Sequence, residues 1–438
     1  MGGGPAGLLC GLLLARSGVS VVVLEKHKDF IRDFRGDTIH ASTMQTMEEL
    51  GILEDFLKLP HTKEKQLAIQ IGDRHYTVAD FCRLPRAVRC RYMSFMPQWD
   101  FLDFLCQKAL SYPSFRLIME AEVIDVLRSG GQDLNGRGNN LGEGWGSESA
   151  KHDDTDNHIE GVRALTFEGD LIVRAVLTIA ADGRHSVVRA KAGMQQWVED
   201  LGAPFDALWL KLPREPQDRT PNLGRLAMGT LFVMLNRHAY WQCAYMIPKG
   251  GLNDLQSQGL EAFRQRLVSL SPLLANRVHH LCTWDDVKLL SVRVDRLHRW
   301  HRRGLLCIGD AAHAMSPVGG VGVNLALQDA VATANILTAS LREGHVPEAR
   351  LHAVQTRRMW PTKAMQHVQM QIQKRVIGRV IQLEGTETIS VPLPFRILQI
   401  FPCLQALPAY LIGLGIRQEH VETLPSVAMD RESDHTTI

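Results

Sequence analysis

Apolar residues near the N-terminus follow first a helical and then an extended pattern. Four leucines recur at helical spacing: Leu8, Leu9, Leu12 and Leu13. This pattern predicts a helix that ends at Gly18. Residues 19–24 are a short β-branched run, which is typical of a buried parallel strand.

The rest of the pattern predicts a chain in which helices and strands are mixed. The expected elements are short strands within 61–95, a helix and then a strand (115–126) within 97–128, an apolar run at 171–181, a helix near 259–270, a buried strand at 305–308 and a helix at 324–343. Between 195 and 290, strands and loops otherwise alternate. This order indicates an α/β protein.

One segment breaks the pattern. Residues 129–157 are rich in Gly, Asn, Asp and Ser and contain little to bury. Such composition favours a loop at the surface. We therefore predict that 129–158 is a flexible insert.

A second segment is unusually apolar. Residues 397–416 contain no charged residue and are long enough to span a bilayer. Pro402 and Pro408 interrupt the stretch, and Gln399 and Gln405 lie within it. Leu398, Phe401, Leu404 and Leu407 follow helical spacing, as expected for short amphipathic segments packed on the protein. We expect no membrane insertion, with association at a membrane surface as the alternative.

Composition narrows the class of partner. The 438 residues carry a formal net charge of +2, with 45% hydrophobic and 22% charged residues, as in ordinary globular proteins. This balance gives no electrostatic reason to expect nucleic acid or an anionic membrane as a partner. The eight cysteines are scattered, without C-x-x-C or metal-ligand spacing. We predict buried free thiols, no metal site and a cytoplasmic protein.

A glycine-rich turn opens the chain. Residues 2–7 match G-x-G-x-x-G, with Gly2, Gly4 and Gly7 in the glycine positions. Such a turn directs backbone N–H groups and a helix N-terminus at a pyrophosphate. Glu25 follows the predicted strand, where a carboxylate accepts hydrogen bonds from an adenosine ribose. Turn, helix, strand and acid together predict a dinucleotide site.

The N-terminus does not fit a targeting signal. A signal peptide would need a basic region before Leu8, and Arg16 ends the apolar run early. Myristoylation requires Ser or Thr where Ala6 stands. A dinucleotide-binding turn normally follows a buried strand, and none precedes Gly2. We expect the natural reading frame to extend upstream and to add a Val/Ile-rich strand.

Two later apolar runs also end in turns of glycine and aspartate. The run at 171–181 leads into Asp182-Gly183, with Val188 and Arg189 close behind. The run at 305–308 leads into Gly309-Asp310. This last pair is followed by His313, Pro317 and the glycine-rich stretch 319–324.

These three motifs, in this order, resemble those of the flavoprotein aromatic hydroxylases, the single-component FAD monooxygenases of the p-hydroxybenzoate hydroxylase fold. The resemblance covers about residues 1–345, and the first β-strand of the family is apparently lacking. It implies a Rossmann-like FAD-binding domain interleaved with a β-sheet substrate domain, followed by C-terminal helices. The implied division is an FAD-binding domain at 1–60, 97–190 and 290–345, a substrate domain at 61–96 and 191–289, and a C-terminal helical segment at 346–438.

The resemblance also implies the residues that contact FAD. The Asp310 carboxylate holds a ribityl hydroxyl, and backbone N–H groups from Gly322 to Asn324 face the pyrimidine edge of the flavin. The Asp-Gly motif serves both FAD and NAD(P)H. The full set of expected FAD contacts is Gly2, Gly4, Gly7, Glu25, Arg35, Gln98, Val123, Asp182, Gly183, Asp310, Pro317, Gly320, Gly322, Val323 and Asn324.

Several of these residues have structural alternatives. Arg35 can form a surface ion pair with Asp33 or Asp37. Asp182 can cap a turn, and Asp310 can cap a helix.

Two further residues near the motifs are ambiguous. We interpret His313 as a structural hydrogen-bonding group rather than a general base, because the sequence shows no partner carboxylate. Arg189 either contacts a nicotinamide-cofactor phosphate or forms an ion pair at a helix start.

The activity that the resemblance implies is an NAD(P)H-dependent FAD monooxygenase. NADPH or NADH reduces the FAD, O₂ then gives a flavin C4a-hydroperoxide, and one oxygen atom hydroxylates or epoxidises a small aromatic, polyketide or terpenoid molecule. The protein orients the substrate and excludes water. The alternatives are a flavin-dependent reductase or dehydrogenase on the same scaffold, and an inactive relative. A role in secondary metabolism and a homodimer are further, open expectations.

The substrate is expected against the sheet of the second domain. Trp241, Cys243, Tyr245 and Ile247 share one face of a predicted strand. Trp241 and Tyr245 are the candidate substrate-lining residues, with ordinary sheet packing as the alternative. Flavin halogenases carry W-x-W-x-I-P on such a strand, and both tryptophan positions differ here, which argues against halogenation.

Overall fold

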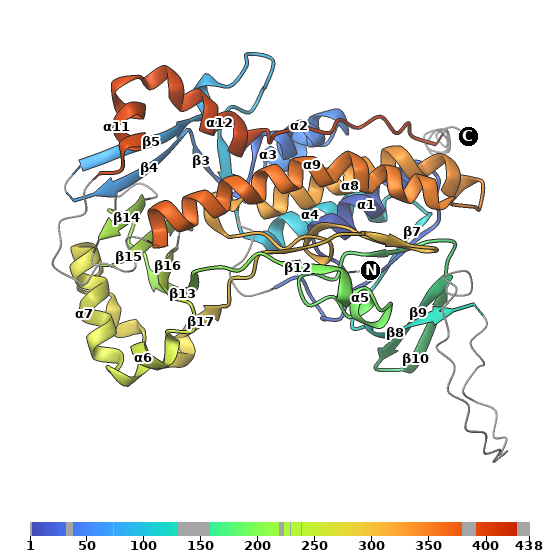
Figure 1. The fold of residues 1–438 in the computed structure, drawn as a ribbon, viewed down its shortest axis with the longest axis horizontal. Helices are drawn as coiled ribbons and strands as arrows, with labels where there is room; N and C mark the ends of the chain where they lie inside the picture. Colours follow the sequence, from blue (N-terminus) through green and yellow to red (C-terminus); the bar gives the residue numbers. More distant parts are fainter. Residues whose placement is uncertain are drawn as a thin grey trace, which may run out of the picture.

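The computed structural model describes residues 2–31, 38–72, 74–129, 158–218, 223–227, 229–237, 239–378 and 391–426. Within these ranges the chain is an α/β fold with small sheets packed around helices at one end and a seven-stranded sheet at the other (Figure 1). The predicted insert 129–158 lies outside the described residues, except for its two end positions.

The first region is built from short sheets. Its parallel pairs are β1 (Val21–Leu24) with β7 (Phe115–Ile118), and β11 (Thr178–Ala180) with β20 (Leu305–Cys307). Two antiparallel sheets have three strands each. One has the order β10 (Gly169–Arg174), β9 (Ile159–Thr166), β8 (Glu122–Arg128), and the other has the order β2 (Thr38–Ile39), β6 (Met93–Phe95), β3 (Thr62–Glu64). In addition, β19 (His301–Arg302) pairs antiparallel with β20, and β12 (Val198–Asp200) pairs antiparallel with β18 (Asp295–Leu297).

Helices fill the centre of this region. They are α1 (Pro5–Arg16), α2 (Ala41–Glu49), α3 (Leu53–Leu57), α4 (Gln98–Leu110), α5 (Val187–Lys191) and the long α8 (Gly322–Arg342). Helix α1 packs against both α4 and α8 (Figure 1). Ten consecutive residues of α1, 6–15, are buried, because a helix enclosed on several sides must be apolar all round. The leucines at helical spacing therefore lie in the main core.

The seven-stranded sheet forms the second region. Its strand order is β17 (Val287–Leu290), β13 (Phe205–Pro213), β16 (Tyr240–Pro248), β15 (Thr230–Asn236), β14 (Leu223–Ala227), β4 (Gln66–Ile71) and β5 (Arg74–Asp80). Helices α6 (Leu252–Ser257) and α7 (Leu260–Leu270) cover one face (Figure 1). The other face packs against Val318 and Ile377.

The last part of the chain is helical. Helix α9 (Glu348–Ile372) lies along α8 and continues into the π-helical turn η9 (Gln373–Ile377) beside the large sheet (Figure 1). Helices α11 (Leu393–Ile400) and α12 (Ala406–Gly413) rest on β5. In the part of the chain that the structure describes, no single helix is long and apolar enough to cross a membrane. The pair 393–400 and 402–413 meets that criterion only together, across a bend of 114°.

The structure differs from the sequence prediction at several element boundaries, including the first strand, which is predicted from residue 19 and begins at Val21. The predicted strand at 115–126 is two strands, β7 and β8, because the chain turns at Glu120, whose φ is +52°. The run at 171–181 likewise divides into β10 and β11. The helix predicted at 324–343 begins two residues earlier, at Gly322.

The predicted burial of the thiols is only partly correct. All eight cysteines are free, and five of them are buried. Cys82, Cys282 and Cys403 are exposed.

A buried carboxylate ties together the edge of the large sheet. Asp206, at the start of β13, accepts hydrogen bonds from Lys249 Nζ at 2.8 Å, the Val292 N–H at 2.9 Å and the Gly250 N–H at 2.9 Å. Burial raises the pKa of Asp206, but these donors outweigh burial and hold the pKa below its usual value. The ionised carboxylate therefore stabilises the fold.

We predict that Asp206→Asn lowers the free energy of unfolding by about 1.5–3 kcal/mol at pH 7, the range for hydrogen bonds to a charged group. The folded-state pKa lies below the unfolded value of about 3.9. The stabilisation is therefore present above about pH 4 and is lost as the pH falls through the folded pKa. Urea denaturation between pH 3 and 7 measures this. A variant as acid-sensitive as the wild type would contradict the assignment.

Candidate FAD site

The three glycine motifs meet in space. A Cβ added to Gly2 would lie 2.3 Å from the carbonyl oxygen of Ala181, just before the Asp-Gly motif. A Cβ added to Gly309 would lie 3.4 Å from Ala6 Cβ in the first motif. Segments separated by up to about 300 residues therefore converge where β1, β11 and β20 end, the edge at which α/β sheets bind ligands.

The first turn is shaped by close backbone approach. Gly2 has a φ of +82°, and a Cβ on Gly7 would lie 2.0 Å from the Gly2 carbonyl oxygen. Both positions therefore require glycine. A Cβ on Gly4, by contrast, would meet no atom within 4 Å. The open space lies at the N-terminus of α1, which has no side-chain cap and no acidic residue in its first turn.

This open helix end fits a phosphate group. Its first N–H groups point outward with the positive end of the helix dipole. The residues of the first motif thus suit the pyrophosphate of a dinucleotide.

Glu25 lies beside this turn. Its carboxylate accepts hydrogen bonds from the Gly3 N–H at 2.9 Å and the His27 N–H at 3.1 Å. The Ala121 N–H donates to the Glu25 carbonyl at 2.9 Å, which brings the start of β8, with Val123, close to Glu25. The structure therefore brings together Glu25 and Val123, two of the predicted FAD contacts.

Asp182 serves the local fold of the second motif. Its carboxylate accepts from Ser186 Oγ at 2.6 Å and from the Val188 N–H at 3.2 Å. Ser186 in turn caps α5. The capping alternative for Asp182 is thus present in the structure.

Arg189 links the second motif to the third. It is buried, and its guanidinium donates to the Ala311 carbonyl at 3.1 Å and to the Arg184 carbonyl at 3.0 Å. Asp295 lies 3.8 Å away. This placement favours the ion-pair interpretation, because Arg189 is enclosed between the two turns.

Asp310 is the more accessible acid of the site. Its side chain is 31% exposed and lies 3.5 Å from Arg184 Nη2. Asp310 follows β20 in a short 3₁₀ turn, Gly309–Ala311. A carboxylate at this place can accept from a ligand hydroxyl, as the resemblance implies.

The glycine-rich turn before α8 is fixed by its neighbours. Thr38 Oγ1 donates to the Gly320 carbonyl at 3.1 Å, and Thr43 Oγ1 donates to Asn324 Oδ1 at 2.7 Å. Helix α8 then begins at Gly322 without a side-chain cap or an acidic first turn. A second helix N-terminus is therefore available to a ligand, and it is positive.

A buried histidine lies next to this turn. His40 Nδ1 lies 2.5 Å from the Ile412 carbonyl in α12. Burial lowers the pKa of His40 to about 4, although the carbonyls of Ile412 and Gly320 act in the opposite direction. His40 is therefore neutral at pH 7 and connects the turn to the C-terminal helices.

Asp329 in α8 supports the third motif from behind. It is fully buried and accepts from the Gly309 N–H at 3.0 Å and from Arg358 Nε at 2.9 Å, and its carboxylate lies 2.6 Å from His313 Nε2. Arg358 also pairs with buried Glu419 at 3.2 Å. Burial raises the pKa of Asp329, but His313 and Arg358 outweigh it and lower the pKa.

His313 therefore has a partner carboxylate, which the sequence did not reveal. Both side chains are fully buried, so His313 is closed off from a substrate. Its structural interpretation agrees with this burial, whereas the expected absence of a partner carboxylate was wrong.

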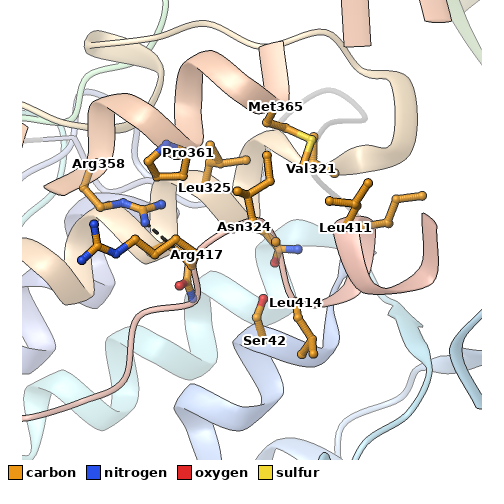
Figure 2. Close-up of a pocket in the computed structure, with 14 residues that line it drawn as sticks. Ser42, Val321, Asn324, Leu325, Arg358, Pro361, Met365, Leu411, Leu414 and Arg417 are labelled. Atoms are coloured by element: carbon orange, nitrogen blue, oxygen red, sulfur yellow. Dashed lines mark hydrogen bonds between the residues drawn. The ribbon is translucent and has the colours of Figure 1, made fainter. Parts of the chain in front are cut away.

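A small cavity lies between α8, α9 and the segment after α12 (Figure 2). Asn324, Arg358, Met365 and Leu414 are among its lining residues. Its volume of about 20 Å³ admits about one water molecule. An organic substrate does not fit there.

The predicted substrate-lining residues lie on the other face of the sheet. Trp241 and Tyr245 are buried in the core formed with α6 and α7. Trp241 Nε1 donates to Asp218 at 3.1 Å, and Tyr245 packs edge-to-face on Phe263 with ring centres 5.3 Å apart. The lining prediction was wrong for this pair, because their side of β16 is covered by helices; the packing alternative applies.

The other predicted contacts lie in or beside these elements. Gly183 has a φ of +85°, Pro317 precedes the turn Val318–Gly320, and Val323 is the second residue of α8. Gln98 is the first residue of α4 and is partly buried. Arg35 lies outside the described residues.

Sequence reasoning missed the supporting residues Asp329, Arg358 and Glu419. Only Asp329 gave a signal, as a charged residue among the apolar positions of a predicted helix.

The chain is similar to a known family and to proteins named as monooxygenases. The family model described as "FAD binding domain" matches residues 1–135 and 144–368. The chain is 30% identical over 383 residues to 6-methylpretetramide 4-monooxygenase of Streptomyces rimosus, covering 87% of this chain and 84% of that protein. It is 24% identical to para-nitrophenol 4-monooxygenase of Pseudomonas sp. strain WBC-3, covering 78% of each.

The fold is also similar to that of solved structures. OxyS anhydrotetracycline hydroxylase from Streptomyces rimosus superposes with a TM-score of 0.67 at 21% identity, covering 95% of this chain and 75% of that chain.

We predict that Asp329→Asn lowers the free energy of unfolding by about 3–5 kcal/mol, because it breaks the fully buried ion pair with Arg358. Urea denaturation measures the change. The matched control is Asp55→Asn, which breaks surface ion pairs with Lys58 and Lys108 and should cost about 1 kcal/mol or less for each pair. Equal effects of the two substitutions would contradict a supporting role for Asp329.

Proposed function

This chain belongs to the FAD-dependent monooxygenase family, and we propose that it transfers one oxygen atom from O₂ to an aromatic or polyketide substrate. The balanced reaction is substrate–H + O₂ + NAD(P)H + H⁺ → substrate–OH + H₂O + NAD(P)⁺. The observation that carries the proposal is the convergence of three glycine motifs on two uncapped helix N-termini. Relatives named as monooxygenases of an aromatic and of a polyketide-type compound support the substrate class.

Each motif has a distinct task in this proposal. FAD, when bound, supplies the redox and oxygen chemistry. The α1 N-terminus and the space over Gly4 would hold the pyrophosphate, Glu25 the ribose, and Asp310 a ribityl hydroxyl.

The start of α8 would act electrostatically. Its outward N–H groups and dipole stabilise negative charge, and reduced flavin is more negative than oxidised flavin. The Gly309 N–H donates to buried Asp329. The turn next to the start of α8 is therefore in place before a ligand binds. Such preorganisation is the main electrostatic contribution that a protein makes.

The nicotinamide cofactor is proposed to bind transiently. The sequence contains one G-x-G-x-x-G turn followed by helix, strand and acid, and that unit is assigned to FAD. In this proposal, residues 61–96 and 191–289 form the substrate domain, whose sheet face encloses the substrate and excludes water.

We predict that Asp310→Asn weakens FAD binding about 10-fold to 100-fold. A hydrogen bond to a charged acceptor contributes about 1.5–3 kcal/mol, and 1.4 kcal/mol corresponds to tenfold. Titration of the apoprotein with FAD, followed by fluorescence, measures the dissociation constant. Asp170→Asn, in exposed β10, is the control. Unchanged FAD affinity of the Asp310 variant would contradict the ribityl assignment.

The oxygen-transfer step separates the proposal from a reductase on the same scaffold. We predict that the FAD-loaded protein, given NADPH or NADH and 6-methylpretetramide or p-nitrophenol as probes, incorporates one atom of ¹⁸O from labelled O₂ into an organic product. Mass spectrometry measures the label. Nicotinamide oxidation without label in any product would favour the reductase alternative, and failure to bind FAD would favour an inactive relative.

A further inference from the structure

Two buried hydrogen-bond donors lie on the face of the large sheet opposite α6 and α7. They are the indole Nε1 of Trp209 in β13 and the amide Nε2 of Gln242 in β16, and neither has a hydrogen-bond partner among the described residues. Gln242 is only 1% exposed. A buried donor without an acceptor costs free energy, so both positions call for an explanation.

The direction of the Gln242 amide is fixed by its neighbour. Arg237 Nε donates to Gln242 Oε1 at 2.9 Å. A guanidinium can only donate, so this atom of Gln242 must be the oxygen. The other amide atom is therefore the NH₂ group. Trp209 Nε1 is also a donor only, and the two groups can be satisfied only by acceptors.

Both donors lie on the side of the sheet that packs against the turn Val318–Gly320. Trp209 packs in the same apolar cluster as Val318, which belongs to the turn Val318–Gly320 before α8. Gln242 alternates with Ala244 and Met246, which belong to that cluster, and is opposed on β16 by Trp241, Cys243 and Tyr245.

The two donors are also near each other. Trp209 pairs with Ala244 across the strands, and Gln242 lies two residues before Ala244 on the same face. Diagonal neighbours of this kind have Cα atoms about 7–8 Å apart. One planar molecule lying on the sheet spans this distance.

We propose that Trp209 Nε1 and Gln242 Nε2 recognise two acceptor oxygens, carbonyl or phenolate, along one edge of a planar polycyclic substrate. The inference rests on the proposed function and adds the substrate's recognition chemistry to it. Arg237, buried against the Phe95 ring with its guanidinium carbon 5.6 Å from the ring centre, is a positioning residue that fixes the Gln242 amide. Around the two donors, Ala244 and Met246 offer an apolar floor for the rings.

The test compares two probes on the FAD-loaded protein. 1,8-Dihydroxyanthraquinone presents oxygens along one edge, and anthracene has the same ring skeleton without oxygen. Binding is followed by quenching of the protein-bound flavin fluorescence. We expect Trp209→Phe and Gln242→Glu each to weaken binding of the anthraquinone about fivefold to tenfold, and to leave binding of anthracene within about twofold of the wild type.

The two substitutions isolate the donors. Trp209→Phe removes the N–H and keeps an aromatic ring. Gln242→Glu keeps the acceptor for Arg237 and replaces the donor by an oxygen, which repels a substrate oxygen. Because Trp209 Nε1 has no partner to lose, we expect Trp209→Phe to keep the thermal stability and the FAD content of the wild type.

Trp241→Phe is the matched control on the opposite face. It removes an indole N–H that donates to Asp218, so it should lower the melting temperature and leave both probes' affinities unchanged. The proposal is overturned if the wild type does not prefer the anthraquinone, or if Trp209→Phe weakens both probes equally. Neither result bears on FAD binding or oxygen transfer, so the proposed function is tested separately.

Discussion

The buried carboxylate of Asp329 is the contact on which the site's geometry depends. It holds the Gly309 N–H, His313 and Arg358 at once, and Arg358 carries the connection to Glu419 in the C-terminal segment. A charge without access to water is tolerated only when it is paired and hydrogen-bonded. These contacts therefore link the turn after β20 to helices α8 and α9 and to the last described segment.

Around this constraint, polar groups divide into two kinds. Some that build the site are satisfied by the chain itself, as Asp182 is by Ser186 and Val188, and Asn324 by Thr43. Those that face outward from it are open: the N-termini of α1 and α8 and, in part, the Asp310 carboxylate. Groups with hydrogen-bond partners in the protein fix the shape of the site, and groups without such partners are available to bind a ligand. The division explains how residues predicted as cofactor contacts can serve the fold through their side chains and leave backbone N–H groups to the ligand.

Much of this arrangement was predictable from the sequence, because glycine turns at strand ends have local signatures. The Asp329 network was not, because its members are joined by folding alone: Arg358 lies 29 residues beyond Asp329 and Glu419 a further 61. The sequence also did not show which face of β16 packs against helices α6 and α7. Alternation shows that Trp241 and Tyr245 share a face. However, the seven consecutive residues 241–247 are all buried, so neither face of this strand is marked by solvent-exposed polar residues. In a strand between two packed layers, the sequence pattern does not reveal which face the helices α6 and α7 cover.

The two tryptophans of neighbouring strands show what each face of the sheet requires. On the helix-covered face, Trp241 has an acidic partner in Asp218, itself held by Arg277 at 2.8 Å. On the face that packs against Val318, the Trp209 indole Nε1 has no hydrogen-bond partner among the described residues. An unmet buried donor costs about 1–3 kcal/mol, a large share of a total stability of about 5–15 kcal/mol. The same fold supplies an acceptor where the indole is purely structural. Whether the indole N–H has an acceptor therefore depends on the face of the sheet and not on the residue type. A face whose buried donors have no acceptor in the protein is suited to a ligand that supplies acceptors.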